Sequence, residues 1–347
     1  MRTAELAGVR NFRLIEEHTP SPAAGEAQVR VHAVGICGSD LHYYGEGSIG
    51  DTKCMYPMVL GHEPTGEILT TGAGVTGWQP GDRVILEPAL YCYHCEFCLT
   101  GRHNVCSSIR FLSTPGEPGF FREVVTLPAR NVMAMPQGLS YAEGTLFEPL
   151  AIVLHSMKFA DPRPGDTAVV FGAGPIGLVT LSVLKMSGAG RTWVVEPVAH
   201  RRHMALELGA DAVLDPGAED VVKTLKRETG NRGFDVVIDC AAKGGSMNQC
   251  LYLARNGGRV VYTGIPSEAA VPLNLHEARR KELILYNVRR SNHETEMALR
   301  LLGDYPGRFA PVVTHGIGMG KIDSAFAMLE QYSDGAGKVA IIPSNSL

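Results

Sequence analysis

The chain lacks any apolar stretch that approaches the roughly 18 residues of a membrane-spanning helix. Its first residues lead to no apolar segment of the kind that a secretory signal peptide carries. It also lacks a Lys/Arg-rich tract, and its net charge of -4 provides no electrostatic reason to bind nucleic acid. These absences predict a cytoplasmic protein that binds neither membranes nor nucleic acid, and thiols stay reduced in that compartment.

The sequence shows no internal repeat or low-complexity segment, and its 40 Gly and 21 Pro residues are too few to indicate disorder. Its length and its apolar content are both large enough for more than one hydrophobic core. Because single hydrophobic cores stop growing at about 250–300 residues, a chain of 347 residues with 45% hydrophobic content is expected to form two domains.

Four of the eight cysteines, Cys92, Cys95, Cys98 and Cys106, lie in one short segment. Four thiols at this spacing can hold one tetrahedral zinc ion. A site with four protein ligands has no open position for chemistry. We therefore predict a structural zinc site that fixes a loop.

Other uses of these cysteines fit the spacing less well. A ferredoxin-type iron–sulfur motif places its last cysteine after a gap of about three residues and before a proline, whereas here the gap spans 99–105 and Ser107 follows. A thioredoxin-like redox pair needs only one CxxC and no further thiol. Thiols without a metal remain the other alternative.

The pattern of the chain changes near Pro162-Arg163-Pro164-Gly165. Before it, the sequence is β-rich, with strands predicted at 29–34, 65–69 and 82–86. After it, strands are predicted at 167–171, 192–195, 235–239 and 259–262, with helices at 175–187 and 201–208. This alternation predicts a parallel sheet with crossover helices. The tail from about 288 loses the alternation and contains one helix (321–332) and a final strand (339–342).

A dinucleotide-binding fingerprint follows the first predicted strand of the second half, in the sequence Gly172-Ala173-Gly174-Pro175-Ile176-Gly177. A strand precedes it and a helix follows, which is the context that this motif requires. Its glycines permit a tight turn, close approach of a pyrophosphate and close helix–strand packing, and the helix N-terminus favours the phosphates.

The residues after the second strand bear on the choice of cofactor. Glu196 ends this strand, and an acid there accepts hydrogen bonds from the adenosine ribose and repels a 2′-phosphate, which favours NAD over NADP. His200, Arg201 and Arg202 follow and could instead attract a 2′-phosphate. We expect these three residues to form the exposed start of a helix, with Arg201 among the cofactor-binding residues.

Metal-ligand residue types also occur at Cys37, His62, Glu63 and Glu148. These residues are far apart in sequence, and their spacing alone does not show that they converge. A lone cysteine is usually a buried thiol, and a His–Glu pair is more often structural than metal-binding.

Five segments together resemble the zinc-containing medium-chain dehydrogenase family, and most closely its sorbitol/xylitol (polyol) dehydrogenase branch. They are 35–44, 57–63, the four-cysteine loop, 147–151 and 172–177. The resemblance covers essentially the whole chain. It implies an α/β protein in which a GroES-like, β-rich catalytic domain (1–150 and 288–347) is interrupted by a Rossmann NAD-binding domain (151–287) with a doubly wound parallel sheet.

The resemblance also implies the catalytic site. Cys37, His62 and Glu63 would bind a catalytic zinc, with water as the fourth ligand and Glu148 supporting the ion directly or through that water. Ethanol-type relatives place a cysteine where Glu148 stands, and an oxygen-rich site suits a hydroxylated substrate. The implied cofactors are two zinc ions per chain and NAD(H), and the implied assembly is a homotetramer or homodimer.

The implied reaction is oxidation of a secondary alcohol to a ketone with hydride transfer to NAD⁺. Ser39 and His42 resemble the family's proton relay, although the Ser39 hydroxyl could simply cap a turn. Asp40 could orient a metal ligand or form a local turn. Tyr43 resembles a residue that lines the polyol pocket, with core packing as the alternative.

The segment from Arg289 to Asn292 resembles a family segment whose arginine binds substrate hydroxyls. Arg290 replaces the aromatic residue expected there, and a second guanidinium could grip the carboxylate of a sugar acid. Arg290 thus makes a sugar-acid (idonate-like) dehydrogenase one alternative function. The others are a 2,3-butanediol dehydrogenase and, because fold does not fix function, a nucleotide-binding scaffold or sensor without turnover.

Overall fold

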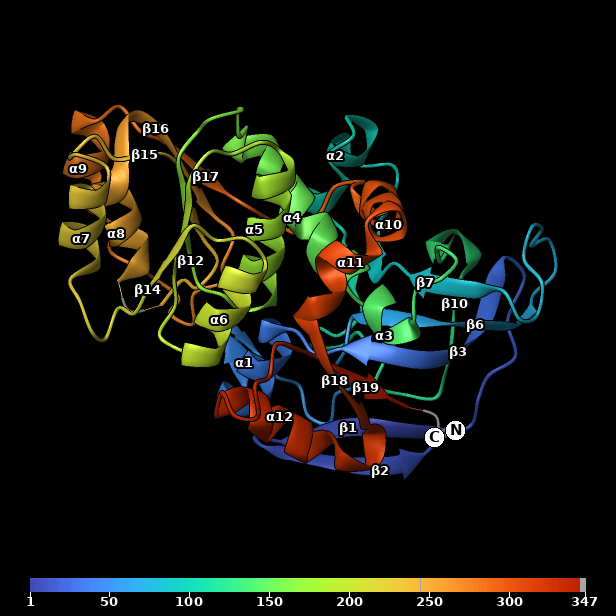
Figure 1. Cartoon of the computed structure of the whole chain (residues 1–347). Helices are drawn as coiled ribbons and strands as arrows, with labels where there is room; N and C mark the ends of the chain where they lie inside the picture. Colours follow the sequence, from blue (N-terminus) through green and yellow to red (C-terminus); the bar gives the residue numbers. More distant parts are fainter. Residues whose placement is uncertain (244, 344–347) are drawn as a thin grey trace. The chain divides into compact units, whose positions relative to one another are not determined.

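The computed structural model describes residues 1–243 and 245–343. Contacts divide the chain into two compact units, shown in Figure 1. Unit 1 comprises 1–148 together with the segment that begins at Thr295, and unit 2 comprises Pro149–Glu294. Residues 288–294, which were expected in the second part of the catalytic domain, therefore belong to unit 2.

Unit 2 is built on a six-stranded sheet in which every neighbouring pair is parallel. Its strands are β12 (Ala168–Phe171), β13 (Thr192–Val195), β14 (Ala212–Leu214), β15 (Phe234–Asp239), β16 (Ala254–Tyr262) and β17 (Ile284–Asn287). Their spatial order, β14-β13-β12-β15-β16-β17, is the 3-2-1-4-5-6 order of a Rossmann fold. All residues of β12, β13 and β15 are buried, as expected for a parallel sheet covered on both faces.

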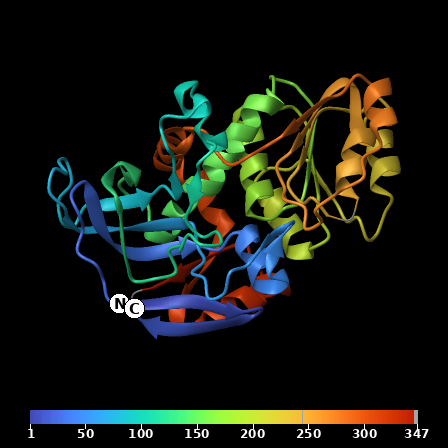
Figure 2. The ribbon, with the colours of Figure 1, turned by 180° about the vertical axis from the view of Figure 1, so that it is seen from behind.

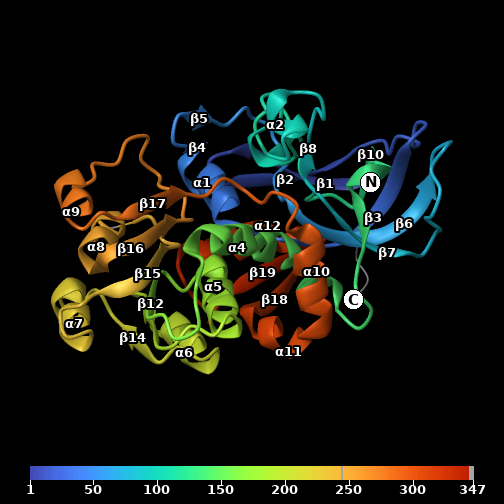
Figure 3. The same ribbon diagram turned by 90° about the horizontal axis from the view of Figure 1, so that it is seen from above.

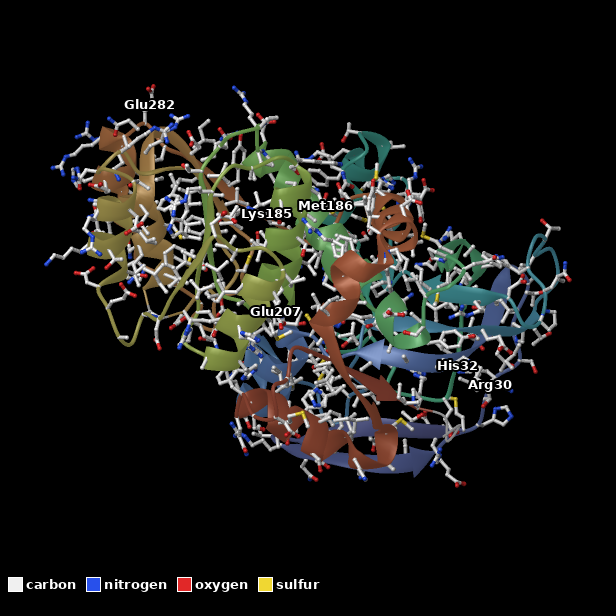
Figure 4. All side chains as sticks on the ribbon, in the orientation of Figure 1. Arg30, His32, Lys185, Met186, Glu207 and Glu282 are labelled. Carbon is white, nitrogen blue, oxygen red and sulfur yellow. The ribbon has the colours of Figure 1, made fainter. Side chains whose placement is uncertain are left out.

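Helices cover both faces of this sheet, as Figures 1 and 3 show. One group lies on one face and contains α7 (Val221–Glu228), α8 (Ser246–Leu253) and α9 (Leu275–Arg280). The other contains α4 (Phe147–Ala160), α5 (Pro175–Met186) and α6 (Ala199–Glu207). Helix α5 starts with a proline at its first position, where the missing N–H costs nothing, and ends at Met186, labelled in Figure 4.

Unit 1 is built on a seven-stranded sheet. Its strands are β3 (Glu26–Gly35), β6 (Glu63–Thr71), β7 (Arg83–Leu86), β10 (Val124–Pro128), β11 (Val132–Ala134), β18 (Val313–Gly318) and β19 (Lys338–Ile342). On β3, Val29 and Val31 are buried, whereas Arg30 and His32, labelled in Figure 4, lie on the outer face. This alternation is what the sequence predicts for a half-buried strand.

The last strands of the chain join the sheet formed by its first third. Strand β19 pairs antiparallel with β3, and β18 pairs parallel with β19. Figure 2, the view from behind, shows these red strands next to the blue ones. Strand β19 thereby brings Lys338 to the end of β3, beside residues that lie about 300 positions earlier in the sequence.

The remaining elements of unit 1 are short. They are β1 (Arg2–Gly8), β2 (Asn11–Glu16), α1 (Gly38–Glu46), β4 (Ser48–Ile49), β5 (Thr52–Lys53), β8 (Ala89–Leu90), α2 (Glu96–Leu99), β9 (Arg110–Phe111), α3 (Tyr141–Gly144), α10 (Thr295–Asp304), α11 (Pro306–Phe309) and α12 (Ile322–Glu330). Across residues 1–243 and 245–343, no helix combines the length and apolar character needed to cross a membrane.

The predicted alternation of the second half is confirmed. The strands expected at 167–171, 192–195, 235–239 and 259–262 correspond to β12, β13, β15 and the end of β16. Strands β14 and β17, which lie at the two edges of the sheet, were not predicted. Two of the three residues of β14 are half-buried, and those of β17 are half-buried or exposed, so both strands lack the continuous apolar run that marked the central strands.

Candidate active site and metal centres

Three of the predicted catalytic ligands lie together in unit 1. The ligand atoms of Cys37, His62 and Glu63 are all within 4.8 Å of one another. The sheet explains this convergence. Cys37 follows the end of β3, His62 directly precedes β6 and Glu63 is its first residue, and the two strands pair antiparallel with Gly35 opposite Glu63. A Cβ at Gly35 would collide with Glu63 Oε2, so glycine there makes room for the carboxylate.

The donor set fits zinc. A thiolate, an imidazole and a carboxylate are ligands that zinc accepts, and three protein ligands leave one position open for a catalytic site. Glu148 is not part of this set, although its carboxyl group is buried and its Oε2 has no hydrogen-bond partner among the described residues. An orphaned buried oxygen is unusual in a folded protein and is consistent with a role toward a bound water or ion.

Asp40 orients this ligand set. Its Oδ2 accepts a hydrogen bond from Cys37 N at 3.0 Å, and its Oδ1 accepts one from Gly61 N at 3.2 Å and lies 3.5 Å from His62 Nδ1. This geometry leaves Nε2 of His62 for a metal. Burial by itself would lower the pKa of His62, but the charges of Asp40 and Cys37 outweigh burial and raise the pKa well above its usual value.

Glu63 forms a buried ion pair with a lysine that was not predicted from the sequence. Lys338 Nζ, on β19, donates to Glu63 Oε1 at 2.7 Å, to Glu63 Oε2 at 2.6 Å and to the Ile36 carbonyl at 3.0 Å. Lys338 is 2% exposed and Glu63 is fully buried. Burial alone would lower the pKa of Lys338, but the charges of Glu63 and Cys37 raise it. Lys338 therefore remains charged and fixes the position of Glu63.

Glu148, at the start of α4, has the most perturbed carboxyl group of the site. Burial raises its pKa to about 8, and the nearby carboxylates of Glu63 and Glu87 add to this effect against the opposing charges of His62 and Lys338. Without a metal, Glu148 is therefore largely protonated at neutral pH.

Replacement of Glu148 by Gln is expected to change how stability depends on pH in the metal-free protein. Because the pKa of Glu148 is raised on folding, the folded state binds the extra proton between about pH 4.5 and 8, and stability falls as pH rises through this window. The slope is at most about 1.4 kcal/mol per pH unit. Urea unfolding of chelator-treated E148Q between pH 5 and 8 should show a flatter profile than that of the wild type, and identical profiles would contradict the burial of a titrating Glu148.

The predicted relay and pocket residues lie on α1, directly after Cys37. Ser39 and His42 are partly exposed, and His42 Nδ1 is 3.1 Å from Glu46 Oε1. Tyr43 is 4% exposed and packs in the apolar core of unit 1. Arg289 is exposed and belongs to unit 2, in the loop after β17.

The four clustered cysteines also converge. Their ligand atoms lie within 4.8 Å of one another, and three of the sulfur–sulfur distances are 3.4, 3.9 and 3.9 Å. A zinc tetrahedron with Zn–S bonds of about 2.3 Å has S–S edges of about 3.8 Å. Hydrogen bonds from backbone N–H groups of Cys98 and Ser107 lower the pKa of Cys95 to about 5. The cluster fits a structural zinc ion.

The glycine loop of unit 2 has the geometry of a phosphate-binding turn. Gly172 has a φ of +91°, a conformation that favours glycine. A Cβ at Gly177 would collide with the Gly172 carbonyl, so this position requires glycine for helix and loop to pack closely. Gly174 is the N-cap residue of α5, and Pro175 and Ile176 form its first turn. The free N–H groups of this helix end are suited to a phosphate.

Glu196 and Arg201 both lie against this loop. Glu196 is 3% exposed, and its two oxygens accept hydrogen bonds from Ala173 N at 2.6 Å and Val198 N at 2.9 Å. Arg201 is 8% exposed, and its Nη1 lies 3.9 Å from where a Cβ of Gly174 would stand. The expectation that residues 200–202 are the exposed start of a helix was therefore wrong for Arg201, whose guanidinium turns back toward the glycine loop.

Comparisons with known proteins agree with this architecture. Residues 23–137 match the alcohol dehydrogenase GroES-like domain, and residues 175–304 match the zinc-binding dehydrogenase domain. Sorbitol dehydrogenase of Bacillus subtilis (strain 168) is 31% identical over 344 residues, which cover 99% of this chain and 98% of that protein. Sorbitol dehydrogenase of Homo sapiens is 36% identical over 333 residues, 95% of this chain and 92% of that protein.

The chain belongs to the zinc-containing medium-chain dehydrogenase family. Its relatives place it in the polyol dehydrogenase branch. A solved Escherichia coli oxidoreductase of unknown specificity matches this medium-chain dehydrogenase with a TM-score of 0.92 and 30% identity over 99% of both chains.

Other solved structures similar to this medium-chain dehydrogenase differ in substrate and cofactor. The 2R,3R-butanediol dehydrogenase of Bacillus subtilis has a TM-score of 0.87 at 28% identity over 99% of both chains. The L-idonate 5-dehydrogenase of Escherichia coli has a TM-score of 0.89 at 26% identity, over 99% of this chain and 98% of that one. A zinc-binding dehydrogenase of Sinorhizobium meliloti, bound to NADP, has a TM-score of 0.89 at 28% identity over 99% of both chains.

Proposed function

We propose that this protein oxidises a secondary alcohol of a sorbitol- or xylitol-like polyol to a ketose and transfers the hydride to NAD⁺. The convergence of Cys37, His62 and Glu63 carries the proposal. The sorbitol dehydrogenase relatives support a polyol as the substrate class. A zinc ion bound to these side chains would act as a Lewis acid on a substrate hydroxyl, and NAD⁺ would accept the hydride.

The chain's own groups would orient the ligands and move the proton. Asp40 and Lys338 hold His62 and Glu63 in place through buried contacts. Ser39 and His42 follow Cys37 on α1 and are partly exposed, so they offer a hydroxyl and an imidazole for transfer of a proton toward solvent. We further propose that the side chains of Tyr43 and Arg289 contact the substrate.

The surroundings of Glu196 support NAD over NADP. A carboxylate at the end of β13 would repel a 2′-phosphate. Two of the basic groups that follow it lie beside acids, whereas Arg201 turns toward the glycine loop: Arg202 lies 3.0 Å from Asp215 Oδ2, and His203 lies 3.2 Å from Glu207 Oε1. These pairs reduce the positive charge available to a phosphate.

Two further substrates are supported by specific observations. The similarity to 2R,3R-butanediol dehydrogenase and to L-idonate 5-dehydrogenase supports a vicinal diol or an aldonate. Arg289 and Arg290 are neighbours in the sequence of unit 2, and two guanidinium groups could together bind the carboxylate of such a substrate.

A panel of alditols, diols and aldonates, each assayed for NADH and NADPH formation, tests these alternatives. If the protein is a polyol dehydrogenase, an alditol should give the highest kcat/KM, and the reduced cofactor formed should be NADH. A preference for an aldonate would assign the arginine pair to carboxylate binding. Absence of turnover with every member and both cofactors would favour the scaffold or sensor instead.

We also propose that the enzyme is a cytoplasmic homotetramer or homodimer. Free thiols support a reducing compartment, since all eight cysteines are unpaired with one another in disulfides. Light scattering of the purified protein would measure the assembly.

A further inference from the structure

Ser113 is a buried serine with an uncommon backbone conformation. It is 3% exposed and has a φ of +86°, in the left-handed region where a side chain is strained. Its N–H donates to the Glu117 carbonyl at 2.9 Å, and its hydroxyl donates to Asp40 Oδ1 at 3.1 Å. Such a conformation persists only where the surroundings hold it, and it often marks a functional side chain.

The hydrogen bond from Ser113 reaches the same oxygen that faces His62. Asp40 Oδ1 accepts from Ser113 Oγ and from Gly61 N, and it lies 3.5 Å from His62 Nδ1. With two fixed donors, this oxygen has little freedom to move away from the imidazole. The Ser113 hydroxyl thus acts on His62 through Asp40.

The segment around Ser113 is itself firmly held. Arg110 Nε and Nη2 donate to the two oxygens of Glu117 at 2.6 and 2.8 Å. Thr114 Oγ1 donates to the Phe111 carbonyl at 2.7 Å, and the Phe111 ring packs on the His62 ring with centroids 5.5 Å apart. The segment therefore contacts both groups: Phe111 packs on the His62 imidazole, and Ser113 donates a hydrogen bond to the Asp40 carboxylate.

We propose that Ser113 is a positioning residue of the catalytic metal site: its hydroxyl fixes Asp40 so that His62 presents Nε2 to the metal. This inference rests on the metal site of the proposed function. Loss of a partner in contact with a metal ligand typically costs about 10- to 100-fold in metal affinity. Ser113 contacts Asp40, which in turn lies beside the metal ligand His62, so loss of the Ser113 hydroxyl is expected to have a smaller effect and to weaken metal binding by roughly 3- to 10-fold.

Cobalt titration of the metal-free protein tests the proposal, since Co²⁺ reports its coordination through visible absorption. The Cys37→Ala variant supplies the reference for the cysteine cluster alone. Ser113→Ala and Ser113→Gly should both bind Co²⁺ more weakly at the catalytic site and shift its absorption. Glycine removes the hydroxyl but relieves the positive φ, so Ser113→Gly should lose affinity while its Tm is at least that of Ser113→Ala.

Thr114→Ala is the matched control, because it removes a neighbouring hydroxyl whose hydrogen bond goes to the Phe111 carbonyl. It should bind Co²⁺ like the wild type, and an equal loss in this variant would assign the effect to general loosening of the segment and overturn the proposal. In an Asp40→Asn background, Ser113→Ala should cause no further loss.

The two possible failures can be distinguished. If the wild type binds no more Co²⁺ than Cys37→Ala, the catalytic metal site itself is absent and the proposed function fails. If the wild type binds one more ion than Cys37→Ala and the Ser113 variants bind it equally tightly, only the role of Ser113 is refuted.

Discussion

Replacement of Cys37 by Ala is expected to abolish turnover and to reduce the metal content from two zinc ions per chain to one. Cys37 provides the thiolate of a three-ligand set, and the remaining imidazole and carboxylate would bind a metal far more weakly. Since loss of an outer partner already costs about 10- to 100-fold, kcat/KM should fall by more than about 100-fold. Metal analysis and steady-state kinetics on the same preparation would measure both effects.

Cys95→Ala is the matched variant, because it removes a thiol from the other cluster. It should also hold one zinc ion per chain, but it should keep measurable turnover and show a lower Tm. Cys95 is the N-cap residue of the short helix α2 and belongs to a closed four-thiol site that fixes a loop. If Cys37→Ala retained the activity of the wild type, the assignment of the catalytic site would fail.

Much of the second unit could be predicted because its signals are local. Alternating apolar runs and glycines predicted the parallel sheet, and the collision that a Cβ at Gly177 would cause explains why the fingerprint requires that glycine. The four-cysteine cluster is local in the same way. In contrast, β17 lies at a sheet edge and is only half-buried, so its sequence lacks a periodic pattern.

Long-range contacts could not be predicted from local patterns. Nothing in the sequence near Lys338 indicates a functional residue, because its role depends on the pairing of β19 with β3. Ser113 stands in a loop without a motif, and only its positive φ and its contact with Asp40 reveal its place.

Replacement of Lys338 by Met is expected to destabilise the metal-free protein by about 3–5 kcal/mol, the usual cost of removing one partner of a buried ion pair. Methionine fills a similar volume, but it leaves the fully buried Glu63 carboxylate and the Ile36 carbonyl without their donor. Urea unfolding of the chelator-treated variant would measure the loss. A Lys338→Met, Glu63→Gln double variant should be less destabilised than Lys338→Met alone, because it removes the unpaired charge.

The same variant tests whether Glu63 is a metal ligand. If Glu63 binds the metal, zinc would supply the positive charge that Lys338→Met removes, and added Zn²⁺ should stabilise this variant more than it stabilises the wild type. If Zn²⁺ stabilises both proteins equally, the Glu63 carboxylate is not neutralised by the ion, and its role is limited to the ion pair with Lys338. Unfolding midpoints of the wild type and of Lys338→Met, each with and without Zn²⁺, would therefore show whether Glu63 binds the metal. Both proteins bury the same Glu63 carboxylate, and they differ only in whether Lys338 supplies a positive charge beside it.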